Sequence, residues 1–260
     1  MLKLLNKYMK ILFFTLIGLG TLNAYEVKNL AHAIDVAGKQ RMFTQRMLKN
    51  YIMIGMENKF SNPSKDLDNI MKDFQEHLDA LISFNKEAIT KVSLLEVKKL
   101  WTPIKLSLKN NPQKSKAGEM QEALESLLAK ANEATFLFAK QSKNTSGEII
   151  NISGRQRMLS QRMASLYMLK VWGIDDPKFK EKMKKAMDLF KNSAKKLMAS
   201  TLNTPKIDSL LKNVNKSFIF FEMMNKSKSK FIPSLIYKKS NDILKDMNTV
   251  TGLYVIEENK

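Results

Sequence analysis

The chain has 260 residues, a formal net charge of +19 and no cysteine. The absence of cysteine excludes a disulfide-stabilised fold and thiol catalysis, so stability must come from packing alone. The length is sufficient for two domains of roughly 115 residues each.

The first 24 residues have the pattern of a secretory signal. Lys3, Lys7 and Lys10 precede a short apolar stretch, and Ala24 offers a small residue for cleavage. The stretch is shorter than the roughly 20 apolar residues that span a bilayer. We predict export to the periplasm with cleavage after Ala24, and an uncleaved membrane anchor is the alternative.

Export changes what the positive charge implies. Residues 1–24 contain three lysines and no acid, so the remaining 236 residues carry a formal charge of +16. In an exported protein this excess favours small anions, acidic polymers or an anionic membrane surface, and we expect no nucleic-acid partner. The lysines are scattered along the predicted helices, which is typical of a solvated face.

The rest of the sequence is almost wholly helical in pattern. Prolines preceded by Asn or Asp, at Asn62-Pro63 and Asp176-Pro177, mark helix starts at matching places in two halves. We predict eight helices, at about 28–58, 63–86, 91–109, 113–143, 144–173, 177–201, 205–226 and 229–257.

Short connections between such helices favour an all-α fold of two tandem antiparallel four-helix bundles. We assign residues 25–143 to the first bundle and 144–260 to the second. No proline occurs between Lys116 and Trp172, and the one interruption is Ser146-Gly147. We therefore predict a long shared helix that stacks the bundles end to end, with both motifs near the junction.

One segment occurs twice. Residues 37–47, AGKQRMFTQRM, return at residues 153–163 as SGRQRMLSQRM, and seven of these eleven positions are identical. A repeat at this long period, 116 residues, indicates two copies of a small domain.

One face of each motif helix suggests a site. Residues three and four apart share a helix face, which gives the rows Gly38, Arg41, Thr44, Gln45 and Gly154, Arg157, Ser160, Gln161. Glycine costs helix stability, so its presence suggests close approach by another group. Arginine presents a planar fork of donors that suits oxyanions. Each row therefore resembles half of a small-anion or small polar ligand site.

The other motif residues have structural interpretations. The second arginines, Arg46 and Arg162, point away from this row. They are expected to form a salt bridge or a snorkelling contact within the bundle, and Met47 and Met163 belong to the core stripe.

Two alternatives to a ligand site stay open. The motif could serve only helix or domain docking, as a structural or protein-interaction module. The lysine excess could bind a polyanion or a membrane surface independently of the motif. If Arg41 and Arg157 lie on separate faces, a homodimer would be needed to complete each ligand site.

The motif G-[KR]-Q-R-M-x-[ST]-Q-R-M resembles the signature of the PilJ-type sensor domain of type IV pili chemotaxis transducers. It is also similar to the P-box of the NarX and NarQ nitrate/nitrite sensor kinases. The second resemblance implies an oxyanion held by the first motif arginine of two paired helices, here Arg41 and Arg157, beside Gly38 and Gly154.

This sequence departs from the kinase P-box, which has Tyr where Gln45 and Gln161 stand here. The sequence also shows no kinase or methyl-accepting region, so we expect a sensory protein that acts through a membrane receptor or kinase partner. With His32 and His77 as its only histidines, it offers no metal-ligand spacing, and we expect no metal, no cofactor and no enzymatic activity.

Overall fold

A computed structural model describes residues 25–142, 145–174, 176–226 and 232–258. The predicted signal peptide, residues 1–24, lies outside these ranges. Among the described residues, no helix has both the length and the apolar character needed to span a bilayer.

The described residues are helical and contain no strand, which confirms the all-α prediction. The helices are α2 (Leu30–Gly55), α3 (Pro63–Phe84), α4 (Ala88–Leu108), the 3-10 turn η1 (Lys114–Lys116), α5 (Ala117–Gln141), α6 (Thr145–Val171), α7 (Pro177–Met198), α8 (Pro205–Lys226) and α9 (Pro233–Glu258).

Side-chain caps explain several helix starts. The Asn62 side chain accepts a hydrogen bond from the backbone N–H of Lys65, and Asp176 accepts one from that of Lys178. In both places a proline follows at the first helical position, where its missing N–H costs nothing. These are the two breaks that the sequence predicted.

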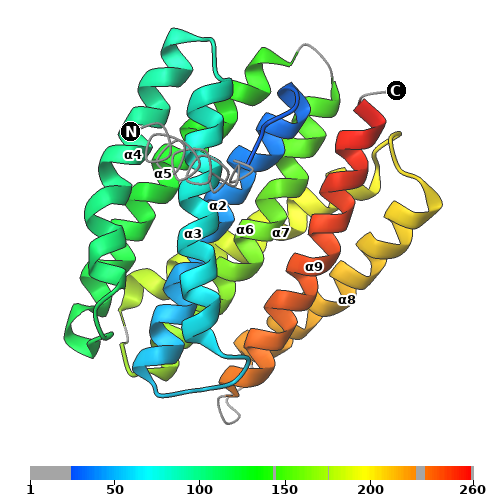
Figure 1. The fold of residues 1–260 in the computed structure, drawn as a ribbon. Coiled ribbons are helices and arrows are strands. Elements are labelled where there is room, and N and C mark those ends of the chain that lie inside the picture. The colour runs from blue at the N-terminus through cyan, green and yellow to red at the C-terminus, as the bar shows by residue number, and fades with distance from the viewer. Residues whose placement is uncertain (1–24, 143–144, 175, 227–231, 259–260) are drawn as a thin grey trace, which may run out of the picture.

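The helices form two groups of four around a common centre. Helices α2 to α5 pack in a ring, helices α6 to α9 pack in a second ring, and α2 packs most extensively against α6. In Figure 1, α2 and α6 run side by side through the middle, with α4 on the left and α8 and α9 on the right. Buried apolar residues of both groups join in one core.

The prediction of end-to-end stacking through a long shared helix is wrong. Helix α5 ends at Gln141, Ser142 is extended (ψ 120°), and α6 starts at Thr145. A Cβ on Gly147 would lie 2.6 Å from the Cβ of Ser142, so glycine allows the chain to reverse closely here. The bundles consequently lie side by side. The domain limits at 25–143 and 144–260 stay a prediction.

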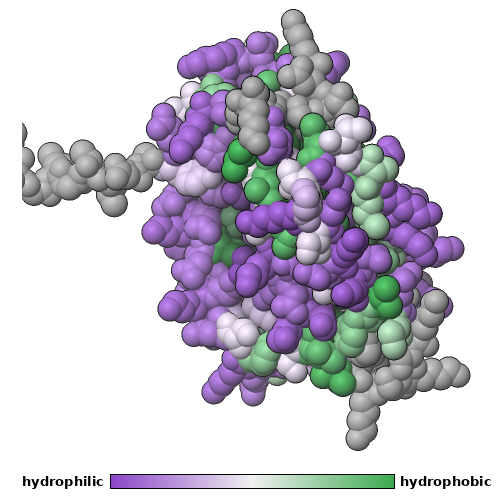
Figure 2. All heavy atoms as spheres, turned by 90° about the vertical axis from the view of Figure 1, so that its right-hand side faces the viewer, coloured by the Kyte–Doolittle hydropathy of each residue, from purple (hydrophilic) through white to green (hydrophobic). Residues whose placement is uncertain are grey.

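The surface agrees with the interpretation of the lysines as a solvated face. The side of the molecule shown in Figure 2 is mainly hydrophilic, with hydrophobic residues in small separate areas.

Glycine at the end of α2 is required by a close contact with the other half. A Cβ on Gly55 would lie 2.3 Å from the Trp172 ring, which follows α6. Gly252 in α9 is a natural control, because nothing lies within 4 Å of the place where its Cβ would stand.

We predict that Gly55→Ala lowers the free energy of unfolding by roughly 1–3 kcal/mol through overpacking. Gly252→Ala should raise it by roughly 0.5–1 kcal/mol, because alanine favours the helix. Urea denaturation of both variants tests this, and equal effects would contradict the Gly55–Trp172 contact.

Candidate functional site

Helices α2 and α6 approach each other at the glycine of each motif. A Cβ on Gly38 would lie 3.9 Å from the Cα of Gly154, 3.3 Å from Arg41 Nη2 and 3.1 Å from Arg157 Nη2. Both Nη2 atoms lie within 3.3 Å of this one point, so the two guanidinium groups are close to each other. The structure thus brings the two glycines and the two first arginines of the motifs together.

Arg41 is completely buried and reaches into the second half of the chain. Its Nη1 donates to Oδ1 of Asn132 (3.0 Å) and Oδ1 of Asn151 (2.9 Å), and its Nη2 donates to the Asn151 carbonyl (3.2 Å). All these acceptors are neutral. Among the described residues, its Nε has no hydrogen-bond partner.

Arg157 is equally buried and makes the mirrored contacts. Its Nη1 donates to Oδ1 of Asn248 (3.3 Å) and forms an ion pair with Oδ1 of Asp35 (2.7 Å), and its Nη2 donates to the Asp35 carbonyl (3.2 Å). Its Nε also lacks a hydrogen-bond partner in the part of the chain that the structure describes.

The two sets of contacts are related by the repeat, with one difference. Asn132 and Asn248 occupy the same position of the repeat, as do residues 35 and 151. Position 35 is aspartate and position 151 is asparagine. Arg157 therefore has a carboxylate partner, and Arg41 has none among the described residues.

The charges of this cluster perturb one another. Burial, followed by the repulsion of Arg155 and Arg157, lowers the pKa of Arg41 well below its usual value. Burial acts to raise the pKa of Asp35, but Arg157 and Lys39 outweigh it, so the carboxyl titrates below its usual range. The centre of the molecule therefore holds more positive than negative charge.

The hydroxyls of the predicted row face their own helices. Thr44 donates to the carbonyl of Arg41, and Ser160 donates to that of Arg157, each at 2.8 Å. Hydroxyls bonded in this way do not point towards the arginine pair.

The glutamines lie farther along the α2–α6 contact. Gln45 donates to Glu125 (3.3 Å) and accepts from Ser165 (3.4 Å). Gln161 donates to the Ser240 carbonyl (2.9 Å) and accepts from Lys49 (2.6 Å). The glutamines thus join the two halves, one helical turn or more away from the guanidinium groups.

The second arginine of each motif forms an ion pair, and the last methionine lies in the core. Arg46 forms an ion pair with Asp66, and Arg162 forms one with Glu125 across the two halves, at 2.6 Å. Met47 and Met163 are fully buried in the core.

A third buried cation was not predicted from the sequence. Lys49 is fully buried and donates to Gln161, Ser240 (3.2 Å) and Asn241 (2.7 Å), with its ammonium 4.0 Å from the centre of the Tyr237 ring. Burial, with a smaller effect of Arg46, lowers its pKa well below the usual value. The equivalent residue of the second repeat is Ser165.

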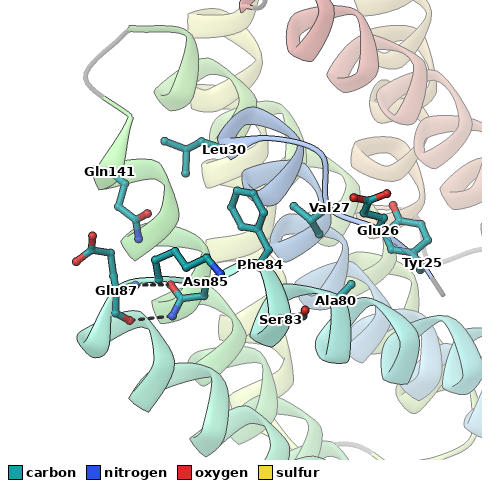
Figure 3. A pocket seen from close by; sticks show the side chains of 11 residues that line it. Tyr25, Glu26, Val27, Leu30, Ala80, Ser83, Phe84, Asn85, Glu87 and Gln141 are labelled. Carbon is teal, nitrogen blue, oxygen red and sulfur yellow. Dashed lines mark hydrogen bonds between the residues drawn. The ribbon is translucent and has the colours of Figure 1, made fainter.

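An open cavity of about 660 Å³ lies at the end of the first bundle, away from the arginine pair. Figure 3 shows Leu30 and Phe84 facing it, with Asn85 and Glu87 bonded to each other at its edge. Its lining includes neither Arg41 nor Arg157. Within the described residues, no group of three or more His, Cys, Asp or Glu side chains could hold a metal ion.

These observations define the class of protein: an all-helical tandem repeat whose two motif helices pair around buried arginines. The family model described as "Type IV pili methyl-accepting chemotaxis transducer N-term" (PilJ) matches residues 23–132 and 138–217. The chain therefore belongs to the PilJ family, whose domains are typically periplasmic sensor domains. Neither the curated proteins nor the solved structures contain a significant match to it.

The sequence analysis missed the partners of the arginines. Asp35, Asn132, Asn151 and Asn248 are polar residues that recur at the period of the repeat, and two of them lie on the motif helices. That recurrence was the available signal. Only the structure shows that each arginine reaches the opposite half.

His77 lies close to this cluster and is 7% exposed. Its ring stands 4.2 Å from that of Tyr25 and 5.4 Å from that of Phe43. Burial, with a smaller effect of Lys39, lowers its pKa to about 3. The folded protein therefore keeps His77 neutral at a pH where the unfolded chain takes up a proton.

We predict that the contribution of neutral His77 to the free energy of unfolding is complete above pH 6.5 and is lost as the pH decreases from 6.5 towards 3. At pH 4.5 this group alone should cost roughly 2–3 kcal/mol relative to pH 7. Urea denaturation at both pH values should show a smaller loss in His77→Gln than in the wild type. An unchanged loss in the variant would contradict a neutral buried His77.

Proposed function

We propose that the protein is a non-enzymatic periplasmic sensory component that binds a small anion, such as nitrate or nitrite, between Arg41 and Arg157. The anion would lie where α2 and α6 meet, beside Gly38 and Gly154. The same geometry would accept a small polar ligand with an oxyanion-like face.

The observation that carries the proposal is the unbalanced charge of the buried arginine pair. Two guanidinium groups meet at the α2–α6 contact, and Asp35 is the one carboxylate paired with either of them in the described structure. Each guanidinium keeps an unpartnered, buried Nε–H. Buried donors without partners are costly, and an oxyanion would supply both the acceptors and the negative charge.

The resemblance to the nitrate-sensor P-box supports the same place for the ligand. The resemblance implies that in those sensors the oxyanion is held by one arginine from each of two paired helices. Here both arginines belong to one chain, at equivalent positions of the repeat. The proposed site is therefore complete without a homodimer.

Sensing requires a partner in this proposal. A ligand bound at the contact between the halves would favour one relative arrangement of α2 and α6, because it bonds to both helices. A membrane receptor or kinase that contacts both halves could read this change.

Docking of the two halves is the second candidate function of the motif. It is favoured by the bonds that the motif residues make across the halves, such as Arg41 to Asn151 and Arg162 to Glu125. Under this alternative the guanidinium groups need no ligand.

Calorimetry and thermal unfolding of the purified protein with nitrate, nitrite and sulfate, and with chloride as control, test the proposal. We predict saturable binding of at least one oxyanion and a higher melting temperature in its presence. Arg157→Gln should weaken binding at least tenfold. Arg162→Gln, which removes an arginine outside the proposed site, should leave the affinity unchanged.

Asn151→Asp is a sharper variant, since it adds only a negative charge beside Arg41. We expect it to raise the melting temperature without ligand and to abolish the oxyanion response, because an internal carboxylate replaces the ligand. Absence of an oxyanion response in the wild type would favour the docking function instead.

A further inference from the structure

An open cavity of about 790 Å³ lies where α5 of the first half meets α6 and α7 of the second half. Its inner residues come from α6 and include Asn151, Ile152 and Arg155. Asn151 is the residue that accepts hydrogen bonds from Arg41. The cavity therefore lies next to the arginine pair, separated from Arg41 by the Asn151 side chain.

The lining of this cavity is positively charged. Lys140, Arg155 and Lys196 contribute three positive charges, and Glu148 contributes one negative charge. Arg155 is partly buried, and burial lowers its pKa. It forms no hydrogen bond or ion pair within the described residues. A desolvated guanidinium without an acceptor favours an anionic partner.

In the first repeat, the residue equivalent to Arg155 has a carboxylate partner. Lys39 stands at the position of Arg155 and forms an ion pair with Asp35 at 3.0 Å. Asp35 stands at the position of Asn151. The Asp35 carboxylate of the first repeat thus forms ion pairs with Lys39 and with Arg157. The same position in the second repeat is a neutral amide.

The neighbourhood of Asp35 is also covered by aromatic side chains. Tyr25 packs on His77 and its hydroxyl lies 3.2 Å from Nε2 of His32. In the second repeat, the residue at the position of His32 is Glu148, which is exposed at the cavity. The cavity thus borders the motif helix that has asparagine, and not aspartate, at the position of Asp35.

The mouth of the cavity carries exposed apolar side chains. Phe136 on α5 is 57% exposed and Leu189 on α7 is 40% exposed, and both line the cavity. Large apolar side chains that flank polar groups in a concave surface are typical of a site for a small organic ligand.

We propose that this cavity binds a small organic carboxylate with an apolar body. Its carboxylate contacts Arg155 and the Asn151 amide, and its apolar body lies against Phe136 and Leu189. The ligand carboxylate supplies beside Arg155 the negative charge that Asp35 supplies beside Lys39. This second site is separate from the one proposed between the two arginines and does not depend on it.

Calorimetric titration of the purified protein with benzoate at low ionic strength tests the proposal, with acetate and benzyl alcohol as comparison probes. We expect saturable binding of benzoate, at least tenfold weaker binding of acetate and no binding of benzyl alcohol. Acetate lacks the apolar body, and benzyl alcohol lacks the charge.

Variants locate the site. Arg155→Gln should weaken benzoate binding at least tenfold, and Phe136→Ser, a change at an exposed position, should weaken it several-fold. The matched control is Lys39→Gln, which removes a positive charge at the equivalent position of the first repeat and should leave the affinity unchanged. Absence of benzoate binding, or equal affinities in Arg155→Gln and Lys39→Gln, would overturn the proposal.

The two proposed sites fail separately. Arg157→Gln should reduce the response to nitrate and leave benzoate binding in place, because Arg157 does not line the cavity. If benzoate binding disappeared with Arg157→Gln and persisted in Arg155→Gln, the carboxylate would bind at the arginine pair, and the separate cavity site would be wrong.

Discussion

The close parallel packing of α2 against α6 determines how the two halves of the molecule are joined. Glycines at positions 38 and 154 allow the two helices to approach, and the guanidinium groups of Arg41 and Arg157 lie against them. Burying two cations together is costly unless each finds acceptors. The asparagines on α5 and α9 and the polar residues at positions 35 and 151 provide these acceptors. The motif, the outer helices and the join between the halves are therefore parts of one polar network.

Duplication within one chain allows the two halves of that network to differ, which two identical subunits cannot do. Asp35 faces Arg157, and Asn151 faces Arg41. Lys49 is buried where the second repeat has Ser165, and its ammonium is held by side chains of α6 and α9. Because Asn151 replaces the aspartate of the first repeat, Arg155 has no carboxylate at the place where Lys39 has Asp35. The asymmetry gives the chain one compensated arginine and one whose partners are all neutral.

Local signals allowed much of this fold to be predicted. The Asn-Pro and Asp-Pro caps fixed helix starts, and the 116-residue repeat revealed two equivalent halves. The direction of the chain after α5 could not be predicted, because it depends on the close approach of Gly147 to Ser142. The arginines were recognisable as candidates, and all five arginines of the chain lie in the two motifs. Asp35 and Asn151 reach the arginines from the opposite half, so these partners could be identified only from the packing of α2 on α6.

Anion binding at the buried arginine pair rests on donors that have no partner among the described residues. Its most direct test is the two-dimensional ¹⁵N–¹H spectrum of the five arginine Nε–H groups, assigned with single Arg→Lys variants and titrated with nitrate. We expect saturable shifts of the Arg41 and Arg157 signals together, with the Arg46 signal unchanged because the Nε of Arg46 already donates to Asp66. Unchanged Arg41 and Arg157 signals at saturating nitrate, nitrite and sulfate would contradict it.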